Sequence, residues 1–513
     1  MTSNNSNYNP EIDLSIIVPV YNEEQLVAKN ITEIISVFSN KQIEFEIIIV
    51  DDGSSDDSLT ICKKFQDKFD RIIHILCNQQ NRGYTSAIKR GIEFSRGEYI
   101  SYLDVDLQYD PQDLLLFYFI ATKTKYHLIT GKTNKSSYSV FRRIVSLSHN
   151  LFVRFLFKNI TRCDINSIKL FSRFILEHNE ILAFKETIGI QLILASQIFN
   201  PSILSVPIDV RRRKKGKSKF KLSLIKHGII NTIKLKKYFK PLNKDKPKIL
   251  LTFDLEEWRM PEHYNRVSLH NANFQFSIDG TYILLKMLKE RNITCTFFTT
   301  GYFAENNPKV LKDIIDMGHE ISSHSYYDRS LSRHKEKDDL SNDIEESIRL
   351  LESITKTKIL GFRAPQFSKN KYLFDVLHDN ILYDSSIHPA FLPGKYIDYH
   401  NPLVPHIIKK KHKYLLEIPC SVFPILRIPI SWWWMRNIGL WLTLYGTTSN
   451  LKRRNNVVLY FHPWEFTEIR ERTVPLHITR YTGKKILRDL EKFIHYFQSK
   501  GYNFSTIKSL YIK

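Results

Sequence analysis

Short apolar runs alternate with amphipathic stretches along the first hundred residues of the chain. The apolar runs predict buried strands at 14–21, 45–52, 72–76 and 98–106, and the amphipathic stretches predict helices at 23–39, 57–69 and 85–95. Strands and helices that alternate in this way form parallel βαβ units. The pattern therefore predicts an α/β fold with a doubly wound sheet, in which ligands bind beyond the carboxyl ends of the strands.

The same alternation begins again near residue 249. Strands are predicted at 249–258 and 294–301, and helices at 280–292 and 308–318. Between the two patterns lies the basic, proline-flanked stretch KKYFKPLNKDKPK, which is typical of a linker. We therefore predict an N-terminal domain over 1–235, a linker over 236–247 and a C-terminal domain over 248–513.

The composition fits folded domains that have an anionic partner. The 513 residues are 42% hydrophobic and 25% charged, and their net charge is +22. A balance this basic favours phosphorylated substrates, an anionic membrane surface or nucleic acid. The polar N-terminus lacks the features of a secretory signal, and the five cysteines lack paired spacing, so we expect reduced thiols. The longest apolar stretch, between Cys420 and Tyr445, is interrupted by arginines and prolines, which argues against a membrane span.

Acidic residues follow two of the N-terminal strands. Asp104 and Asp106 form a D-x-D pair, and two such carboxylates can hold a divalent cation against a diphosphate. A lone D-x-D is more often a solvated turn. Asp51 and Asp52 lie at the end of a second strand, where they could grip a nucleobase edge and its ribose.

Four motifs in order, VPVYNEE, VDDGSSDDS, NRGYTSAIKRG and DVDLQYDP, resemble the family 2 inverting glycosyltransferases over residues 13–225. The resemblance is closest to the dolichyl- or undecaprenyl-phosphate sugar synthases. It implies a nucleotide-diphospho-sugar transferase (GT-A) domain that uses a nucleotide sugar and Mg²⁺ or Mn²⁺. The nucleotide would be lined by Pro19, Tyr21, Glu23 and Asp52 with Asp51 beside it, and the metal and diphosphate would be placed by Asp104, Asp106 and Gln108.

Later residues point to a polyprenyl phosphate as the acceptor. In the resemblance, Arg142 and Ser146 match a lipid-phosphate position, and Asp164 with Lys169 matches a D-x-x-S-G-F-[RK] segment in which Ile168 replaces the usual glycine. The loop RRKKGKSK matches R-x-x-G-x-S-K, which closes over phosphates through Arg213, Gly216, Ser218 and Lys219. A run this basic is otherwise a solvated linker or a nucleic-acid patch, but the chain carries no recognised nucleic-acid motif.

The stretch LSLIKHGIINTIKLKKYFK then predicts either an interfacial helix on anionic lipid or an ordinary packed helix. With the lipid phosphate as acceptor, we expect a cytoplasmic protein that is peripheral to the inner face of the membrane.

Five segments of the C-terminal half, TFDLEEW, GHEISSHSYYD, GFRAPQFS, YDSSIHP and LYFHPWEF, resemble the polysaccharide deacetylase family, also called the NodB-homology or carbohydrate esterase 4 group. The similarity spans 248–468 and implies a distorted (β/α) barrel with its site at the strand ends. Amide hydrolysis needs a Lewis acid, a base for water and an acid for the amine. The resemblance makes Asp254 the base, Arg363 its orienting partner, and His462 the acid, tuned by Asp384.

The same resemblance assigns a divalent metal, Zn²⁺ or another ion, to Glu256 (or Glu257), His324 and Asp328. The family usually has His-x-x-x-His where this chain has His324-x-x-x-Asp328. Aspartate at this spacing can still ligate zinc, and it favours harder ions. The alternative is a decayed site that only binds carbohydrate, although Asp254, Arg363 and His462 would then have no purpose.

Other polar and aromatic residues of this half are expected to be structural. We expect His319 to cap or pack, and His334 to be solvated. The stretch 421–445 reads as a core-packing insertion, although its aromatics could instead face sugar or lipid.

Together, the two halves suggest consecutive steps on one molecule. The first domain would transfer an N-acylated sugar to polyprenyl phosphate with inversion, and the second would remove the acyl group. The alternatives are an envelope-polysaccharide transferase and deacetylase with a glycan acceptor, or a transferase joined to a dead carbohydrate-binding module.

Overall fold

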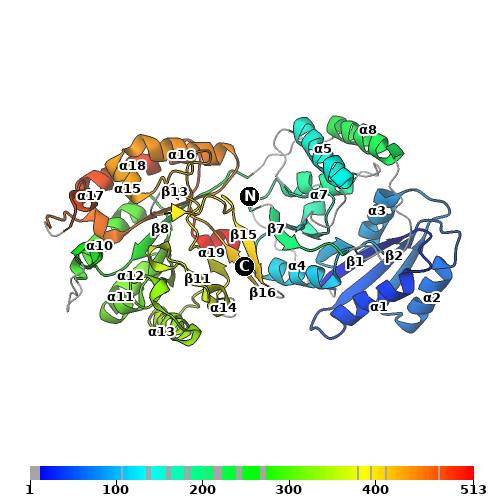
Figure 1. The fold of residues 1–513 in the computed structure, drawn as a ribbon, viewed down its shortest axis with the longest axis horizontal. Coiled ribbons are helices and arrows are strands. Elements are labelled where there is room, and N and C mark those ends of the chain that lie inside the picture. The colour runs from blue at the N-terminus through cyan, green and yellow to red at the C-terminus, as the bar shows by residue number, and fades with distance from the viewer. Residues whose placement is uncertain are drawn as a thin grey trace. The chain divides into compact units, whose positions relative to one another are not determined.

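The computed structural model describes residues 12–105, 108–133, 140–157, 163–177, 181, 187–201, 203–211, 222–238, 245–265, 273–377, 381–392, 396–410, 413–471 and 474–513. The chain divides into two compact units, Met1–Asp245 and Lys246–Lys513 (Figure 1). This division falls inside the predicted linker 236–247, and the helix before the linker continues through Tyr238. Among the helices of the described residues, none combines the length and the apolar character that crossing a membrane requires.

The N-terminal unit is built on a seven-stranded sheet of order β3-β2-β1-β4-β6-β5-β7. Its strands are β1 (Leu14–Val20), β2 (Phe45–Asp51), β3 (Ile73–Cys77), β4 (Tyr99–Tyr102), β5 (Leu128–Thr133), β6 (Lys169–Ser172) and β7 (Ile203–Ile208). Its helices are α1 (Val27–Phe38), α2 (Ser58–Lys68), α3 (Tyr84–Phe94), α4 (Pro111–Lys123), α5 (Val140–Leu156), α6 (Phe174–Glu177), α7 (Ile188–Ser196) and α8 (Leu222–Tyr238). The predicted parallel βαβ pattern holds for β1 to β4, whereas β6 runs antiparallel to both of its neighbours.

The first strands form because their residues are apolar on both faces. Every residue of β2 and nearly every residue of β1 is buried, as expected for central strands covered by helices on both sides. The predicted strand 98–106 is longer than the observed β4, which ends at Tyr102. Asp104 therefore lies in the loop that follows the strand. That loop is where a ligand of a doubly wound sheet binds.

The C-terminal unit holds an eight-stranded sheet of order β15-β16-β12-β11-β10-β9-β8-β17. Its strands are β8 (Ile249–Leu255), β9 (Thr296–Thr299), β10 (Glu320–Ser323), β11 (Gly361–Phe362), β12 (Tyr383–Asp384), β15 (His406–Lys410), β16 (Lys413–Glu417) and β17 (Val457–Phe461), and β13 (Phe391–Leu392) pairs separately with β14 (Tyr396–Ile397). All neighbours in the large sheet are parallel except β15 and β16. Beyond β16, Ser421 N donates to Val458 O of β17 at 2.9 Å, which curls the sheet towards closure.

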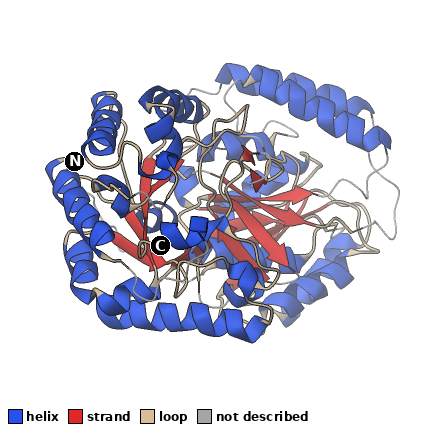
Figure 2. Cartoon of the chain, turned by 60° about the vertical axis from the view of Figure 1, so that its left-hand side comes forward, coloured by secondary structure: helices blue, strands red, loops and turns tan. Residues whose placement is uncertain are grey.

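Helices surround the strands of this unit (Figure 2). They are α9 (Met260–Asn265), α10 (Gln275–Glu290), α11 (Gly301–Asn306), α12 (Pro308–Asp316), α13 (Lys337–Thr355), α14 (Leu373–Leu377), α15 (Trp432–Asn437), α16 (Leu440–Lys452), α17 (Leu476–Thr479), α18 (Lys484–Ser499) and α19 (Ile507–Tyr511), with 3₁₀ turns η2 (Leu331–Arg333), η3 (Pro365–Phe367) and η4 (Pro463–Phe466). The arrangement is a distorted (β/α) barrel, as predicted.

A close approach of backbone to backbone fixes one wall of the barrel. Helix α10 packs against η4, and a Cβ atom at Gly280 would lie 1.8 Å from the carbonyl oxygen of Pro463. Only glycine fits at this position, because the backbone oxygen cannot move away as a side chain could. The packing holds the turn that follows β17 against the core, and that turn carries His462.

Candidate active sites

In the N-terminal unit, acidic residues gather at one edge of the sheet. Strands β2, β1 and β4 are adjacent and parallel, with Val20 opposite Asp51 and Ile17 opposite Tyr102. Because parallel strands end at the same edge, the segments after them lie together. This brings Pro19, Tyr21, Glu23, Asp51, Asp52 and Asp104 to a single rim.

The two aspartates after β2 differ in what they bind. Asp52 accepts three hydrogen bonds, from Asn78 Nδ2 at 2.7 Å and from the backbone N–H groups of Arg82 and Gly83 at 2.9 and 2.8 Å. Asp51 Oδ2 accepts from Ser54 N at 3.2 Å, whereas its Oδ1 is buried and has no partner among the described residues. A buried acceptor without a donor costs free energy, so Asp51 rather than Asp52 has an oxygen to offer a ligand.

The loop after β4 is held from three sides. Tyr84 donates its hydroxyl to Asp104 Oδ1 at 2.7 Å, and Asn30 of α1 donates to the carbonyl of Val105. The carbonyl of Gln108 accepts from Arg211 N at 2.8 Å. Asp106 lies outside the described residues. The first carboxylate of the D-x-D pair is thus fixed in place at the rim by its neighbours.

Most of the predicted lipid-phosphate residues lie outside the described part of the molecule. This is true of Arg213, Gly216, Ser218 and Lys219, and of the side chains of Arg142 and Ser146 on α5. Just before the basic loop, Arg211 forms ion pairs with Glu33 and Asp110, both at 2.5 Å. The sequence motifs did not indicate Arg211, which links the chain after β7 to α1 and to the N-cap of α4.

Lys169, the first residue of β6, is hydrogen-bonded to the residues that precede this strand. Its Nζ donates to the carbonyl oxygens of Ile165, Ser167 and Asp164 at 2.7, 2.9 and 3.2 Å. Burial lowers the pKa of this ammonium group to about 8. Asp164 in turn accepts from Thr133 Oγ1 at 2.6 Å. Both residues of the D-x-x-S-G-F-[RK]-like segment therefore stabilise the short stretch that leads into β6, and Asp164 ties it to the end of β5.

In the C-terminal unit, a buried ion pair joins two strand ends. Arg363 Nη1 donates to Asp254 Oδ1 at 2.6 Å, and the same guanidinium reaches Thr252 Oγ1 at 2.9 Å and Ser385 Oγ at 3.0 Å. Burial alone would raise the pKa of Asp254, but the positive charge of Arg363 and its hydrogen bond lower it below its usual value. Asp254 is therefore held as a carboxylate deep in the barrel.

Three potential metal ligands converge next to this pair. Glu256, His324 and Asp328 each present a ligand atom, all within 4.8 Å of one another, and all three residues are buried. The His324 Nδ1 lies 2.8 Å from the carbonyl oxygen of Arg363, to which it donates as N–H, and this leaves Nε2 facing Glu256 Oε2 at 3.7 Å. Burial lowers the pKa of His324 to about 4, so the ring is neutral and can act as a ligand.

The two carboxylates of this cluster lie in a buried, acid-rich environment. Burial and the nearby charge of Asp328 raise the pKa of Glu256 well above its usual range, and burial with the charge of Glu257 raises that of Asp328. A divalent cation between them would favour the ionised form of both carboxylates. Two carboxylates and one imidazole make a donor set that fits zinc or a harder divalent ion.

The structure also separates the two neighbouring glutamates. Glu257 is buried and committed elsewhere, because its Oε1 pairs with Arg259 at 2.7 Å and its Oε2 accepts from Thr300 at 3.0 Å. Glu256 alone of the two faces His324 and Asp328. Of the alternatives left open by the sequence, the geometry favours Glu256.

His462 stands on the opposite side of Glu256 in an aromatic pocket. Its Nε2 lies 3.9 Å from Glu256 Oε1, and its ring stacks on Trp464 and meets Trp432 edge-on at a centroid distance of 4.9 Å. Its Nδ1 lies 3.1 Å from Glu465 Oε1. Glu465, rather than the predicted Asp384, makes the contact that orients this ring.

Asp384 has other partners. It accepts a hydrogen bond from the hydroxyl of Ser386 and forms a side-chain hydrogen bond with Glu417, which is fully buried. Burial raises the pKa of Asp384 to about 6 and raises that of Glu417 well above its usual range. The structure thus places Asp384 at the strand ends, but in an acid pair beside the cluster.

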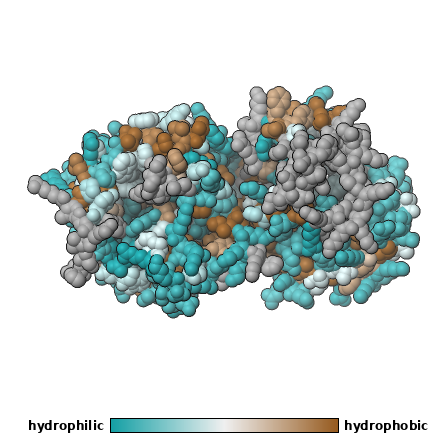
Figure 3. All heavy atoms as spheres, in the orientation of Figure 1, coloured by the Kyte–Doolittle hydropathy of each residue, from teal (hydrophilic) through white to brown (hydrophobic). Residues whose placement is uncertain are grey.

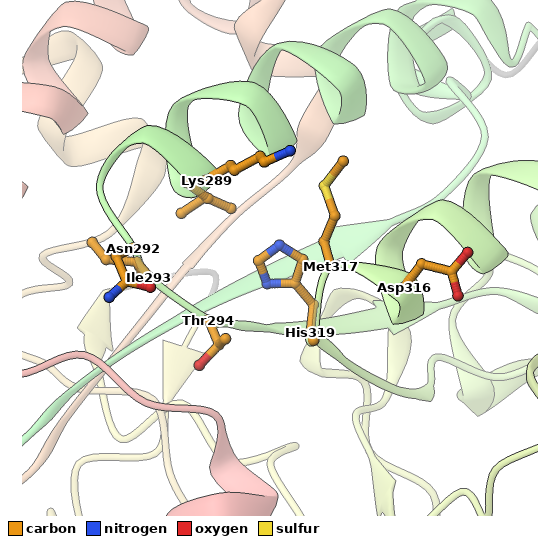
Figure 4. Close-up of a pocket in the computed structure, with 9 residues that line it drawn as sticks. Lys289, Asn292, Ile293, Thr294, Asp316, Met317 and His319 are labelled. Carbon is orange, nitrogen blue, oxygen red and sulfur yellow. The ribbon is translucent and has the colours of Figure 1, made fainter.

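Two other histidines lie away from the cluster. His319 precedes β10 and lines a pocket of about 410 Å³ at the opposite ends of the strands, with its ring among Lys289, Thr294 and Met317 (Figure 4). Its Nδ1 accepts from Cys295 N at 3.2 Å, so it packs and caps as expected. His334 was expected to be solvated, but it is partly buried and its Nε2 pairs with Asp343 at 2.9 Å.

Comparison with known proteins matches each unit to a family. Residues 15–179 match the model of Glycosyl transferase family 2, residues 242–381 that of Polysaccharide deacetylase, and residues 385–511 a domain of unknown function (DUF3473). The chain joins a family 2 glycosyltransferase domain to a polysaccharide deacetylase domain. The third match begins just after Asp384 and includes His462, so the deacetylase barrel continues through it.

Two relatives of the glycosyltransferase domain have names that include a polyprenyl phosphate. The chain is 31% identical to the dodecaprenyl-phosphate galacturonate synthase of Rhizobium johnstonii, over 28% of this chain and 42% of that protein. It is 33% identical to the undecaprenyl-phosphate 4-deoxy-4-formamido-L-arabinose transferase of Pseudomonas fluorescens, over 28% and 41%. The chain thus spans less than half the length of these curated relatives.

A solved structure is similar to the deacetylase domain. The peptidoglycan N-acetylglucosamine deacetylase Bc1960 aligns with 19% identity and a TM-score of 0.31, over 52% of this chain and 88% of that chain.

Sequence reasoning missed three residues of the deacetylase cluster. Glu465 follows His462 by three residues in HPWEF, an acid spacing that could have indicated the contact. Gln366 hydrogen-bonds to Asp328 and takes a left-handed backbone conformation with φ 56°. Trp432 comes from a mostly apolar segment that resembles none of the family motifs. Each acts on a residue that the motifs did indicate.

Glu465→Gln should lower the deacylation kcat about tenfold, less than the roughly 10²- to 10⁴-fold that a general acid itself contributes, because Glu465 only positions His462. Glutamine keeps the size of the side chain, but its amide cannot balance a proton held on His462. Rates measured across pH distinguish this from a structural effect: the pH profile changes with Glu465→Gln and is restored by Glu465→Asp. A profile that is unchanged in shape would show that Glu465 only supports the fold.

Proposed function

We propose that the chain is a bifunctional enzyme that transfers an N-acylated sugar from a nucleotide diphosphate to a polyprenyl phosphate, with inversion, and then removes the acyl group in its second domain. The observation that carries the proposal is the buried arrangement of Asp254 with Arg363 beside Glu256, His324 and Asp328. A domain that only bound carbohydrate would have no need of an ionised acid next to three convergent ligand side chains.

In the proposed transfer step, the lipid phosphate attacks the anomeric carbon of the sugar. A phosphate is already ionised, so this step needs no strong general base. It needs the two phosphates to be held together and the leaving diphosphate to be stabilised. Asp104, with Asp106 and Gln108, would hold Mg²⁺ or Mn²⁺, and that ion would neutralise the diphosphate. Asp51 would accept a donor group of the nucleotide through its unpaired Oδ1.

In the proposed deacylation step, Asp254 accepts a proton from the attacking water, while Arg363 holds its carboxylate in place. A divalent ion held by Glu256, His324 and Asp328 would supply Lewis-acid polarisation of the amide. His462 gives a proton to the leaving amine, and Glu465 orients its ring through Nδ1. Trp432 and Trp464 wall this side of the site and limit the access of bulk water.

The names of the relatives support a lipid-linked substrate. One of them is named as a transferase of a formamido sugar and undecaprenyl phosphate, and the amide bond of a formamido group is one that a deacylase hydrolyses. The fusion of both domains in one chain supports consecutive action on one product. We therefore place the protein at the cytoplasmic face of the membrane, where a nucleotide sugar and a polyprenyl phosphate meet.

The acceptor decides between this proposal and the glycan-extending alternative. The full chain is incubated with labelled nucleotide N-acyl sugars, Mn²⁺, and either a short polyprenyl phosphate or an oligosaccharide. We expect label on the lipid phosphate only, seen by thin-layer chromatography and mass spectrometry. Label on the oligosaccharide and none on the lipid would contradict the proposal.

Asp328 gives a direct test of the metal site. Asp328→Ala should weaken binding of a divalent ion by at least about 10- to 100-fold, the range that loss of an outer-sphere partner already costs. Asp328→His, which restores two histidines at the usual spacing, should keep the site and shift its preference towards zinc. Metal content of the purified chain, measured with graded Zn²⁺ and Mn²⁺, checks both. Equal metal content in Asp328→Ala and the parent would exclude Asp328 as a ligand.

A further inference from the structure

An apolar surface on the deacetylase unit has no role in the proposed chemistry. It consists of Ile425, Leu426, Ile438, Trp441 and Tyr445, which are all exposed. Ile425 is 69% exposed and Trp441 is 62% exposed, although both are among the most apolar residue types. We call these five residues the α16 patch. Figure 3 shows hydrophobic atoms gathered along the edge of this unit where Figure 1 places α16.

The α16 patch is a single, built surface. Ile425 and Leu426 form the tip of a tight turn in which Phe423 N donates to Ile428 O at 2.8 Å and Arg427 N donates to Phe423 O at 2.9 Å. That turn is fastened to α16, because Phe423 stacks on Tyr445 with ring centroids 5.5 Å apart. The exposed side chains are therefore held outwards by a packed base.

The same helix is buried on its other side. Leu442, Gly446 and Leu451 of α16 face the core, and Thr443 Oγ1 donates to Ile430 O at 2.8 Å. Trp441 and Tyr445 are four residues apart, so they lie on one face of the helix and point away from the core. The prediction that the stretch 421–445 is a core-packing insertion therefore holds for one face of α16 only.

The charged residues of the segment that forms the patch have one sign. From Ile418 to Trp464 the sequence contains no aspartate or glutamate, whereas it contains five basic residues, Arg427, Arg436, Lys452, Arg453 and Arg454. The last three are exposed at the end of α16. An apolar surface with tryptophan and tyrosine, on a segment that carries cations and no acids, has the composition of a surface that lies at the boundary of headgroups and acyl chains.

The patch also lies close to the catalytic acid along the chain. Trp432 of α15 contacts the ring of His462, and Ile438 follows it by six residues, about 9 Å along a helix. A sugar attached to a membrane lipid by a phosphate would thus have to reach only a short way from the bilayer to the site.

We infer that the α16 patch docks the deacetylase unit on an anionic phospholipid bilayer, with Ile425, Leu426 and Trp441 entering the acyl-chain boundary and the cations of α16 contacting the headgroups. The use of this contact to present a lipid-linked sugar rests on the proposed function. The contact itself requires no catalytic activity, so the two ideas fail separately.

Tryptophan fluorescence tests the contact in the full chain. All six tryptophans, Trp258, Trp432, Trp433, Trp434, Trp441 and Trp464, belong to the C-terminal unit, so their emission does not report on membrane binding by the N-terminal unit. Vesicles of phosphatidylcholine and phosphatidylglycerol with brominated acyl chains should quench the emission of the bound protein. Trp441→Phe should remove most of this quenching, whereas the control Trp434→Phe should retain it.

Two further variants test the apolar tip and the charge. Ile425→Asp with Leu426→Asp should abolish quenching, and Arg453→Glu with Arg454→Glu should reduce binding to anionic vesicles at least fivefold more than binding to neutral ones. The thermal unfolding midpoint of each variant, together with its deacylation of a soluble substrate, shows that the unit is folded.

Protein that sediments with vesicles but shows no quenching, or protein that does not bind vesicles, would overturn the inference. Trp441 emission that instead responds to a soluble chito-oligosaccharide, or to protein concentration alone, would assign the patch to a glycan or to a second copy of the chain. A chain that deacylates lipid-linked sugar in detergent but shows no quenching with brominated vesicles would refute the docking alone.

Discussion

Asp254→Asn should abolish deacylation, lowering kcat by about 10³-fold, while transfer to the lipid continues. General-base catalysis contributes about 10²- to 10⁴-fold, and an amide cannot take the proton from water. Asp254 is fitted to this task because Arg363 keeps its pKa low despite burial, so it is ionised throughout the neutral range. The measurement is release of free acyl groups together with the mass of the lipid product.

The choice of asparagine controls for folding. Removing the whole side chain would leave the guanidinium of Arg363 buried without its partner, and breaking such a pair costs about 3–5 kcal/mol. Asparagine still accepts the bond from Arg363 Nη1, and Thr252 and Ser385 remain as partners. The transferase rate of the same preparation is the internal control. Deacylation within twofold of the parent rate would remove Asp254 from the chemistry.

Asp104→Asn should have the opposite selectivity, with sugar transfer lowered about 10²- to 10³-fold and deacylation of a supplied lipid-linked sugar unchanged. Losing one preorganised electrostatic group at a developing charge costs about this much. Asp104 lies at the rim formed by β2, β1 and β4, where Tyr84 fixes one of its oxygens. Asparagine keeps the bond from Tyr84 but removes the charge that would bind the metal and diphosphate.

A matched control separates site from surface. Asp70→Asn also removes one carboxylate from the N-terminal unit, but an exposed one that lies between α2 and β3, away from the carboxyl ends of the strands. It should leave transfer within twofold of the parent rate. Equal transfer by Asp104→Asn and Asp70→Asn, measured at saturating Mn²⁺ and nucleotide sugar, would show that Asp104 does not hold the diphosphate.

The strand ends were the part of both sites that could be predicted from the sequence. Apolar runs that stop at VPVY, VDD, TFD and YFHP locate the ends of buried strands, and parallel strands bring those ends together. The motifs then placed Asp104 at the strand ends of the N-terminal unit, and Asp254, Arg363 and His462 at the strand ends of the C-terminal unit. The two family domains predicted from these motifs are confirmed by the family models that match residues 15–179 and 242–381.

Side-chain partners could not be read in the same way. Glu256 and Glu257 are adjacent in sequence, and only Arg259 and Thr300 show that Glu257 is engaged elsewhere. Glu465, rather than Asp384, meets His462 because η4 folds back beside it, a turn whose position depends on packing against Gly280. In the N-terminal unit, Asp52 binds the 78–83 loop, which no local pattern indicates.

The location of the acyl group over time tests consecutive action of the two domains most directly. The full chain is incubated with a nucleotide N-acyl sugar and a short polyprenyl phosphate, and the products are followed by mass spectrometry. The lipid-linked N-acyl sugar should appear first and convert to the lipid-linked amine, and Asp254→Asn should stop at the acylated lipid. A lipid product that keeps its acyl group in the parent protein, or an amine found only on free or nucleotide-linked sugar, would contradict the account.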